Sequence, residues 1–126
     1  MVKRIIAGLI GALTAANGAL MLFAGRHWFE TTPSVADTGP FNPHFVADIG
    51  AAYSVAGLAL LARAWRPQYW PAAIAGAAFF CAHALIHVVG LLGGHSHHAG
   101  FEWMMVVIPA GASLWAAFPS KGELHA

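Results

Sequence analysis

Two pairs of ionisable side chains stand four residues apart inside apolar stretches of this chain. Asp48 follows His44, and His87 follows His83. Residues four apart lie on one face of a helix, so each pair would present its two polar groups side by side. An ionisable group in hydrocarbon is costly unless it is paired or solvated. We therefore expect both pairs to face the interior of a helix bundle and to meet there.

The expected cluster offers the ligand types of a transition-metal site. Its imidazoles and carboxylate suit zinc, copper(II) or non-haem iron, and the cluster contains no thiolate. Glu102 could supply a fifth ligand or orient one of the histidines. The sequence thus predicts a metal site formed by His44, Asp48, His83, His87 and Glu102, with the identity of the metal left open.

Two other arrangements use the same side chains without a bare metal ion. A hydrogen-bonded Asp–His network would fix the helix register by itself. Alternatively, a four-helix bundle can hold haem between two histidines on facing helices, for example His44 with His83 or His87. The ligand types alone leave these alternatives open.

Further polar residues belong to the same half of the expected bundle. Asn17 lies toward the end of the first apolar stretch and could orient a ligand as Glu102 could. The Gly- and His-rich stretch 93–100 carries His95, His97 and His98, and it resembles a metal-capture tract. An ordinary polar loop explains this stretch equally well.

Four apolar stretches must position these residues. They span residues 5–25, 44–64, 69–93 and 101–118, and about 20 apolar residues suffice to cross the hydrocarbon as a helix. Charged residues make up only 9% of the chain, against about 25% in soluble domains. The sequence predicts an all-α, polytopic membrane protein in which residues 1–126 form one antiparallel four-helix transmembrane bundle.

Two local signals define helix ends and irregularities. Asn42 followed by Pro43 is typical of a helix N-cap with proline in the first turn. Pro109 should kink the fourth helix or open its hydrogen-bond ladder. The connection 26–43 is long and polar, and it would act as a lid if the chain is an enzyme. Pairs of small residues four apart, such as Gly50 and Ser54, should let helices approach closely.

Charge placement predicts the orientation in the membrane. With four spans, Arg26 falls on one side of the membrane and the other five basic residues fall on the side of the two termini. These five are Lys3, Arg4, Arg63, Arg66 and Lys121. By the positive-inside rule, both termini should be cytoplasmic and most histidines should face the periplasm. We read the first apolar stretch as a retained helix because it is longer than the apolar region of a secretory signal, about 7–15 residues.

One segment resembles known proteins. The residues from Phe41 to Tyr53, Phe-Asn-Pro-His-Phe-Val-Ala-Asp-Ile-Gly-Ala-Ala-Tyr, lead into a Gly/Ala/Leu helix that ends at Arg63. This segment and the helix order resemble small four-helix bacterial membrane proteins, which include the DoxX-like proteins and related uncharacterised families. The resemblance implies a bundle in the bacterial inner membrane and transfers no activity. In site chemistry alone, the two pairs are similar to the Asp/His copper sites in membrane subunits of particulate methane and ammonia monooxygenases.

Three functions remain open from the sequence. The chain could bind a transition metal as a metal-handling accessory or a small metalloenzyme, which would activate water or dioxygen. It could instead be a non-catalytic subunit of a larger membrane complex, or a haem-binding electron carrier. The expected partners are the lipid bilayer and either further copies of the chain or a larger complex. A net charge of +1 gives no reason to expect a nucleic acid.

Overall fold

The computed structural model describes residues 1–94 and 98–123, and all regular structure in these ranges is helical. The elements follow in this order: α1 (Val2–Phe23), α2 (Gly25–Thr31), η1 (Ala36–Thr38), α3 (Pro43–Trp65), η2 (Pro67–Tyr69), α4 (Trp70–Leu92), α5 (Ala99–Glu102), the π-helical turn η3 (Trp103–Val107), α6 (Ile108–Ala117) and η4 (Lys121–Glu123). The long helices begin and end within a few residues of the expected stretches.

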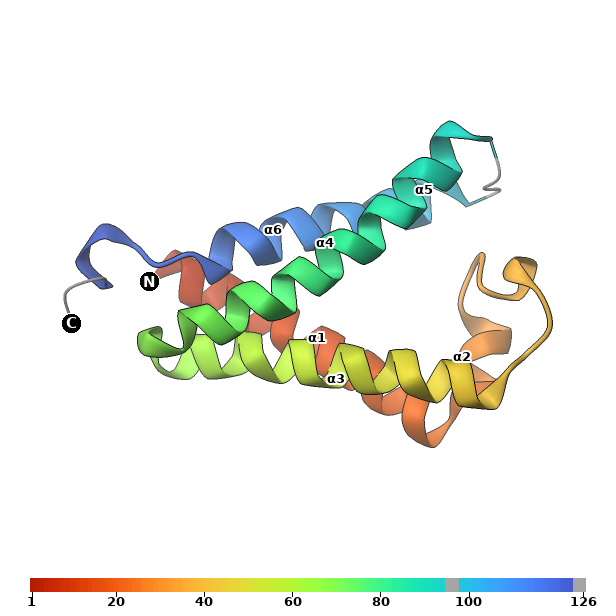
Figure 1. Cartoon of the computed structure of the whole chain (residues 1–126), viewed down its shortest axis with the longest axis horizontal. Coiled ribbons are helices and arrows are strands. Elements are labelled where there is room, and N and C mark those ends of the chain that lie inside the picture. The colour runs from red at the N-terminus through yellow and green to blue at the C-terminus, as the bar shows by residue number, and fades with distance from the viewer. Residues whose placement is uncertain (95–97, 124–126) are drawn as a thin grey trace.

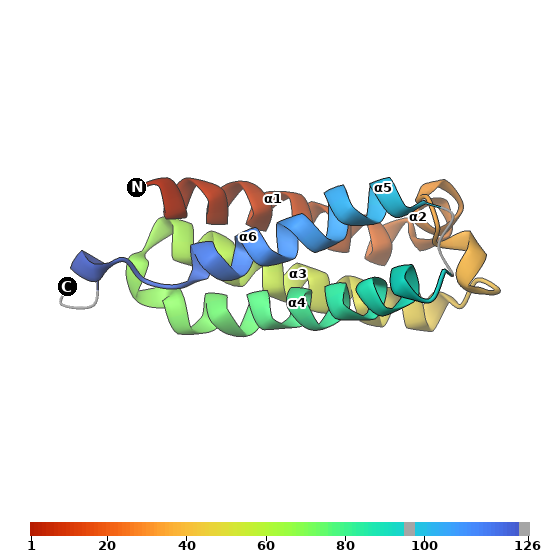
Figure 2. The same cartoon turned by 90° about the horizontal axis from the view of Figure 1, so that it is seen from above.

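The long helices alternate in direction along the bundle. Figure 1 shows both chain termini at the same end as the turn between α3 and α4, and we call this end the terminal end. The other end holds α2 and α5, and we call it the loop end. In the second view, α1 and the α5–α6 segment lie toward the upper side of the picture, and α3 and α4 lie toward the lower side (Figure 2). The four long helical segments therefore form an antiparallel, all-helical bundle.

The helix surfaces are apolar on the outside as well as at their contacts. Four helical segments, Val2–Phe23, Pro43–Trp65, Pro67–Leu92 and Ala99–Ala117, are long and apolar enough to cross a membrane. Large apolar side chains such as Leu13, Val55 and Ile86 point outward and are exposed. The core, by contrast, consists mainly of alanines with Leu60 and Phe80. The prediction of an all-α chain with four long apolar helices is confirmed.

The closest helix contact joins α1 to α3 through glycines. A Cβ atom added at Gly57 would lie 2.6 Å from the backbone nitrogen of Ala15 and 2.8 Å from the carbonyl oxygen of Gly11. A Cβ atom added at Gly18 would lie 2.6 Å from the carbonyl oxygen of Gly50. Backbone thus packs against backbone along most of the pair, as small residues four apart predicted.

The two local signals in the sequence are both confirmed. The Asn42 side chain accepts a hydrogen bond from the Phe45 backbone N–H at 3.1 Å, and Pro43 begins α3. Directly before Pro109 the chain forms the π-helical turn η3, in which the Ile108 N–H donates to the Trp103 carbonyl five residues back. Pro109 has no N–H to continue the α-helical ladder, so the ladder opens at this point.

The polar connection after α1 contains regular structure. It contains the short helix α2 and the 3-10 turn η1. The Trp28 indole N–H on α2 donates to the Asn17 side-chain oxygen on α1 at 2.9 Å. This bond holds α2 against the end of α1. Asn17 is therefore used in fixing α2, and its side chain is not among those that contact the histidines of α4.

Basic residues at the terminal end bind the carboxyl ends of other helices. Arg4 donates to the carbonyl oxygens of Ala64 and Trp65, both at 2.9 Å, and these are the last residues of α3. Lys3 donates to the Phe118 carbonyl oxygen, just after α6, at 3.2 Å. Cations are favourable at helix C-termini because the unpaired carbonyls there carry negative partial charge. These residues therefore tie the helix ends together.

Arg63 makes the most buried polar contact at this end. Its side chain is fully buried in the last turn of α3. The guanidinium donates to both carboxylate oxygens of Glu123, at 3.3 and 2.6 Å, and to the Ala117 carbonyl oxygen at 3.4 Å. Glu123 Oε2 also accepts from the Ser120 backbone N–H at 2.7 Å. The segment after α6 is thereby anchored to α3.

We predict that Gly57→Ala destabilises the bundle. The new methyl group would overlap backbone atoms of α1 that cannot rotate away, and such overpacking costs about 1–3 kcal/mol. Unfolding in a denaturing detergent, followed by circular dichroism, measures the loss. Gly111→Ala is the matched control because a Cβ atom there meets nothing within 4 Å. Equal stability of the two variants would contradict the close α1–α3 contact.

The Arg63–Glu123 pair should make stability depend on pH in the acid range. The Ser120 backbone N–H, followed by the Arg63 guanidinium, holds the pKa of Glu123 below its ordinary value of 4.5. A lowered native pKa gives stability that is fully present above the unfolded pKa and is lost as the pH falls through the native pKa. We expect wild type to exceed Glu123→Ala in thermal stability above about pH 4.5, and the difference to shrink at lower pH. A difference that grows on acidification would contradict the pairing.

Candidate functional site

The structure brings together three of the predicted site residues at the loop end. His87 Nδ1 lies 2.9 Å from Glu102 Oε2, and His87 Nε2 lies 3.2 Å from His83 Nε2. The Glu102 side chain is almost fully buried, at 7% exposure, while that of His87 is 26% exposed. The three side chains therefore form a continuous polar chain, which we call the His83–His87–Glu102 chain.

Two helices, α4 and α5, position the His83–His87–Glu102 chain. His83 and His87 stand one helical turn apart in the second half of α4, so their rings project from the same face. Glu102 is the last residue of α5, directly before the π-helical turn. The carboxylate thus reaches the histidines from the segment that returns into the bundle. A buried carboxylate requires such a partner because its desolvation is otherwise costly.

The hydrogen-bond roles in the chain follow from the atoms involved. If the His87 Nδ1–H donates to the Glu102 carboxylate, His87 Nε2 carries a lone pair that faces His83. The His83 Nε2–H can then donate to that lone pair at 3.2 Å. The carboxylate in this way selects one tautomer and one ring orientation for His87. This is the arrangement by which a carboxylate prepares a histidine to bind a metal through its other nitrogen.

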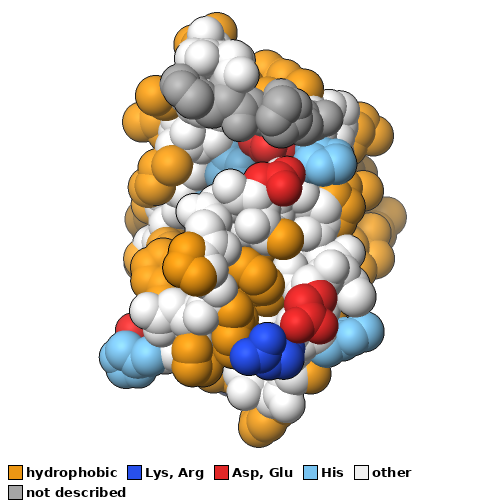
Figure 3. All heavy atoms as spheres, turned by 90° about the vertical axis from the view of Figure 1, so that its right-hand side faces the viewer, with side chains coloured by type: hydrophobic (Ala, Val, Ile, Leu, Met, Phe, Trp, Pro, Cys, Tyr) orange, Lys and Arg blue, Asp and Glu red, His pale blue; other side chains and the backbone are white. Residues whose placement is uncertain are grey.

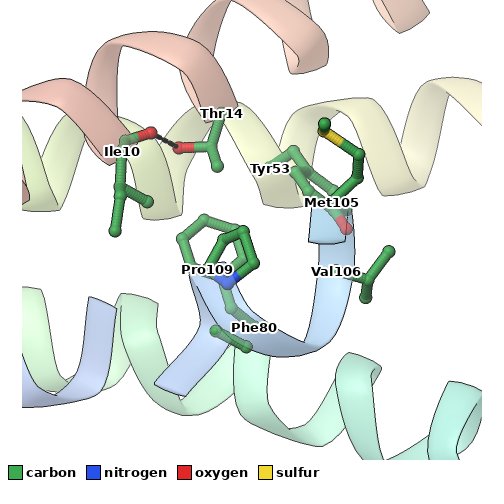
Figure 4. A pocket seen from close by; sticks show the side chains of 8 residues that line it. Ile10, Thr14, Tyr53, Phe80, Met105, Val106 and Pro109 are labelled. Atoms are coloured by element: carbon green, nitrogen blue, oxygen red, sulfur yellow. Dashed lines mark hydrogen bonds between the residues drawn. The ribbon is translucent and has the colours of Figure 1, made fainter. Parts of the chain in front are cut away.

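Aromatic rings of α3 and α4 close the inner side of His83. The Tyr53 ring meets the His83 ring edge-on, with centroids 5.6 Å apart, and Phe79 stacks on His83 at 6.3 Å. Behind Tyr53 lies a small cleft of about 20 Å³, with room for roughly one water. Figure 4 shows Tyr53 and Phe80 facing Thr14 of α1 and Pro109 of α6 around this cleft. The site thus has an apolar wall toward the bundle centre.

His44 and Asp48 do not join this chain, which corrects the expectation of one cluster. They pair with each other at 3.4 Å, and their side chains are 88% and 63% exposed. Tyr53 is the α3 residue that faces His83, and Asp48 is turned about 140° away from it around the helix. In addition, α3 and α4 diverge toward the loop end (Figure 1). Helical spacing predicted each pair correctly but not the relative rotation of the two helices.

Other charged groups of the loop end have their own partners. Figure 3 looks onto this end and shows histidines and carboxylates at several separate places on it. His98 pairs with Asp37 at 3.7 Å, which links the segment before α5 to η1, and Arg26 pairs with Glu30. Of the Gly/His-rich stretch, His95 and His97 lie outside the described residues. Whether that stretch binds metal therefore stays a prediction.

The geometry fits two ligands of one metal ion rather than a complete site. Two nitrogens that bind one tetrahedral zinc at about 2.0–2.1 Å stand roughly 3.3 Å apart, close to the 3.2 Å between His83 Nε2 and His87 Nε2. Among the residues that the structure describes, no group of three or more His, Cys, Asp and Glu side chains could hold a metal ion. Any further ligands must come from elsewhere.

Sequence reasoning missed two of the contacts that define the two ends. Tyr53 lies within the segment discussed for His44 and Asp48. Around the helix it stands between Gly57, which contacts α1, and Ala56, which contacts α4. That spacing could have placed Tyr53 inside as well. The Arg63–Glu123 pair spans 60 residues of sequence, and no local pattern indicates it.

Comparisons with protein-family models, with curated proteins and with solved structures found no match for this chain. Any statement about its function must therefore rest on the arrangement of its own residues.

We predict that the buried and the exposed carboxylates differ in their effect on stability. Glu102→Gln replaces the carboxylate partner of His87 by a neutral amide, and the weaker hydrogen bond should cost about 1 kcal/mol. Asp48→Asn alters an exposed pair and should change the free energy of unfolding by less than about 0.5 kcal/mol. Detergent unfolding measures both. Equal effects would mean that Glu102 does not support His87.

Proposed function

We propose that this chain is an integral protein of the bacterial inner membrane with both termini in the cytoplasm. Four helical segments of sufficient length and hydropathy support the insertion. The described basic side chains of the terminal end, on Lys3, Arg4, Arg63 and Arg66, support the orientation by the positive-inside rule. In this orientation the His83–His87–Glu102 chain faces the periplasmic side.

We propose further that the protein binds a transition-metal ion through His83 and His87, as an accessory in metal handling or a small metalloenzyme. One observation carries the proposal: the two Nε2 atoms face each other at 3.2 Å while Glu102 accepts from the opposite nitrogen of His87. An i, i+4 histidine pair backed by a carboxylate is a common metal-binding arrangement. His44 and Asp48 are not needed in this reduced ligand set.

The protein's own residues would do three things at such a site. Glu102 holds the His87 ring in place and keeps its Nε2 available. Tyr53 and Phe79 fix the His83 ring from the side. The mostly apolar residues around the small cleft beside Tyr53 leave room there for only about one water. A bound ion of this kind supplies Lewis acidity or redox chemistry, according to whether it is zinc, copper or iron.

Elemental analysis of chelator-free protein tests the proposal. We expect about one equivalent of copper, zinc or iron per chain, as for a single His-based site, in the wild-type protein. His83→Ala and His87→Ala should lose the metal because each removes one of the two ligands. Glu102→Gln should retain it with an affinity weaker by about 10–100-fold, the usual effect of losing a supporting partner.

His44→Ala is the matched control for these variants. It removes a histidine from the same end of the bundle, but one that is exposed and pairs only with Asp48 among the described residues. It should therefore bind metal as the wild type does. Metal that is retained in His83→Ala, or lost in His44→Ala, would contradict the assignment.

A non-catalytic subunit of a larger membrane complex is the second candidate. One observation favours it: without a metal, His83, His87 and Glu102 lie at hydrogen-bond distance, and one choice of tautomers satisfies both contacts. Among the described residues, no buried side-chain nitrogen or oxygen lacks a partner. A metal-free polar network would then fix the register of α4 against α5. This candidate predicts co-purification with a larger assembly and no stoichiometric metal.

Haem binding and the DoxX-like resemblance stay predictions. His83 and His87 stand one turn apart on the same helix, whereas bis-histidine ligation of haem uses histidines on facing helices. An optical spectrum of the purified protein, made with adequate haem supply, distinguishes the cases, because a Soret band would appear only for the haem protein.

A further inference from the structure

A second polar site lies at the terminal end, at the opposite end of the bundle from the His83–His87–Glu102 chain. The Glu123 carboxylate is held there by three donors: two guanidinium nitrogens of Arg63 and the Ser120 backbone N–H. A guanidinium fork that binds both oxygens of a carboxylate also matches two oxygens of a phosphate. Arg63 thus forms an anion receptor, and in this structure the occupant is a carboxylate of the same chain.

The two partners of this contact are held with very different strength. Arg63 belongs to the long helix α3, and its side chain has no exposed surface. Glu123 belongs to the three-residue turn η4, outside the spanning segments, and its side chain is 18% exposed. Glu123 is therefore the partner that can leave. A buried guanidinium without an anion is strongly unfavourable, so whatever replaces Glu123 must also be negatively charged.

The terminal end, where the receptor lies, carries the side chains that are typical of a lipid headgroup region. Lys3 lies over the Trp115 ring at 5.1 Å, and Arg66 lies over the Trp65 ring at 4.3 Å. Both tryptophans are at least half exposed, and exposed tryptophan next to cations is typical of the membrane–water interface. The cations attract anionic lipids, which are the abundant anions at a membrane surface.

We propose that Arg63 forms a binding site for the phosphate of an anionic phospholipid, and that Glu123 occupies this site as an internal, exchangeable competitor. The lipid phosphate takes the place of the carboxylate on the guanidinium fork, while its acyl chains lie along the exposed apolar side chains of the bundle. The segment after α6 that carries Glu123 is released from α3 when the lipid is bound. The lowered pKa of Glu123 agrees with a receptor that favours negative charge.

Lipid titration of the purified full chain tests this site. Short-chain phosphatidylglycerol is added to wild type and to Glu123→Ala in a neutral detergent, and thermal unfolding and native mass spectrometry follow its binding. Without lipid, Glu123→Ala should unfold at a lower temperature, since Arg63 has lost its anion. Phosphatidylglycerol should restore its stability with a half-saturating concentration about tenfold lower than for wild type, because the competing charged hydrogen bonds are gone.

Three controls define the outcomes. Glu30→Ala removes an exposed Arg–Glu pair at the opposite end and should respond to the lipid as wild type does. Short-chain phosphatidylcholine should have little effect on any form. If Glu123→Ala responds to phosphatidylglycerol no more than wild type, the proposal is wrong. If inorganic phosphate alone restores Glu123→Ala as well as the lipid does, the site binds free anions and the lipid assignment is overturned.

Discussion

The backbone contact between α1 and α3 is the constraint on which the rest of the bundle depends. Glycines on both helices let the chains approach until a methyl group would collide with the opposite backbone. This contact occupies one face of α3 and thereby decides which of its side chains turn toward α4. Tyr53 faces α4, and His44 and Asp48 face outward. The glycine contact between α1 and α3 thus determines the directions in which the polar side chains of α3 point.

Burial of charge explains the two ends of the molecule in the same terms. At the loop end, the Glu102 carboxylate is buried and has a histidine as its partner. At the terminal end, the Arg63 guanidinium is buried and has a carboxylate and a carbonyl as partners. Between them the core is built almost entirely from alanine and a few larger apolar residues. An ionisable group that is kept in such surroundings must be compensated at its own position, and this requirement places both polar sites.

Much of the fold can be predicted from the sequence, because length, hydropathy, proline and N-cap signals act over short distances. The four long helices, the cap at Asn42 and the opened ladder before Pro109 all follow from residues within a turn or two. The His83–His87 pair follows from spacing in the same way. The rotation of α3 against α4 does not, because it depends on glycine contacts with a third helix, α1. For the same reason the sequence predicted His44 and Asp48 in one cluster with His83, His87 and Glu102, whereas the structure joins only the last three. No local pattern indicated the Arg63–Glu123 pair.

The π-helical turn at residues 103–107 has a consequence for the register of the last long helical segment, Ala99–Ala117. Such a turn contains one residue more than an α-helical turn. The side chains before it are therefore rotated by about 100° about the helix axis, compared with their directions in an uninterrupted α-helix. Without this phase shift, Glu102 would point along a different side of the helix while Ala110 and Ala117 kept their places in the core. The opened ladder before Pro109 therefore lets the two parts of this helix direct their side chains independently. The part after the turn, Ile108–Ala117, packs in the bundle core, while the part before it directs the Glu102 carboxylate at His87.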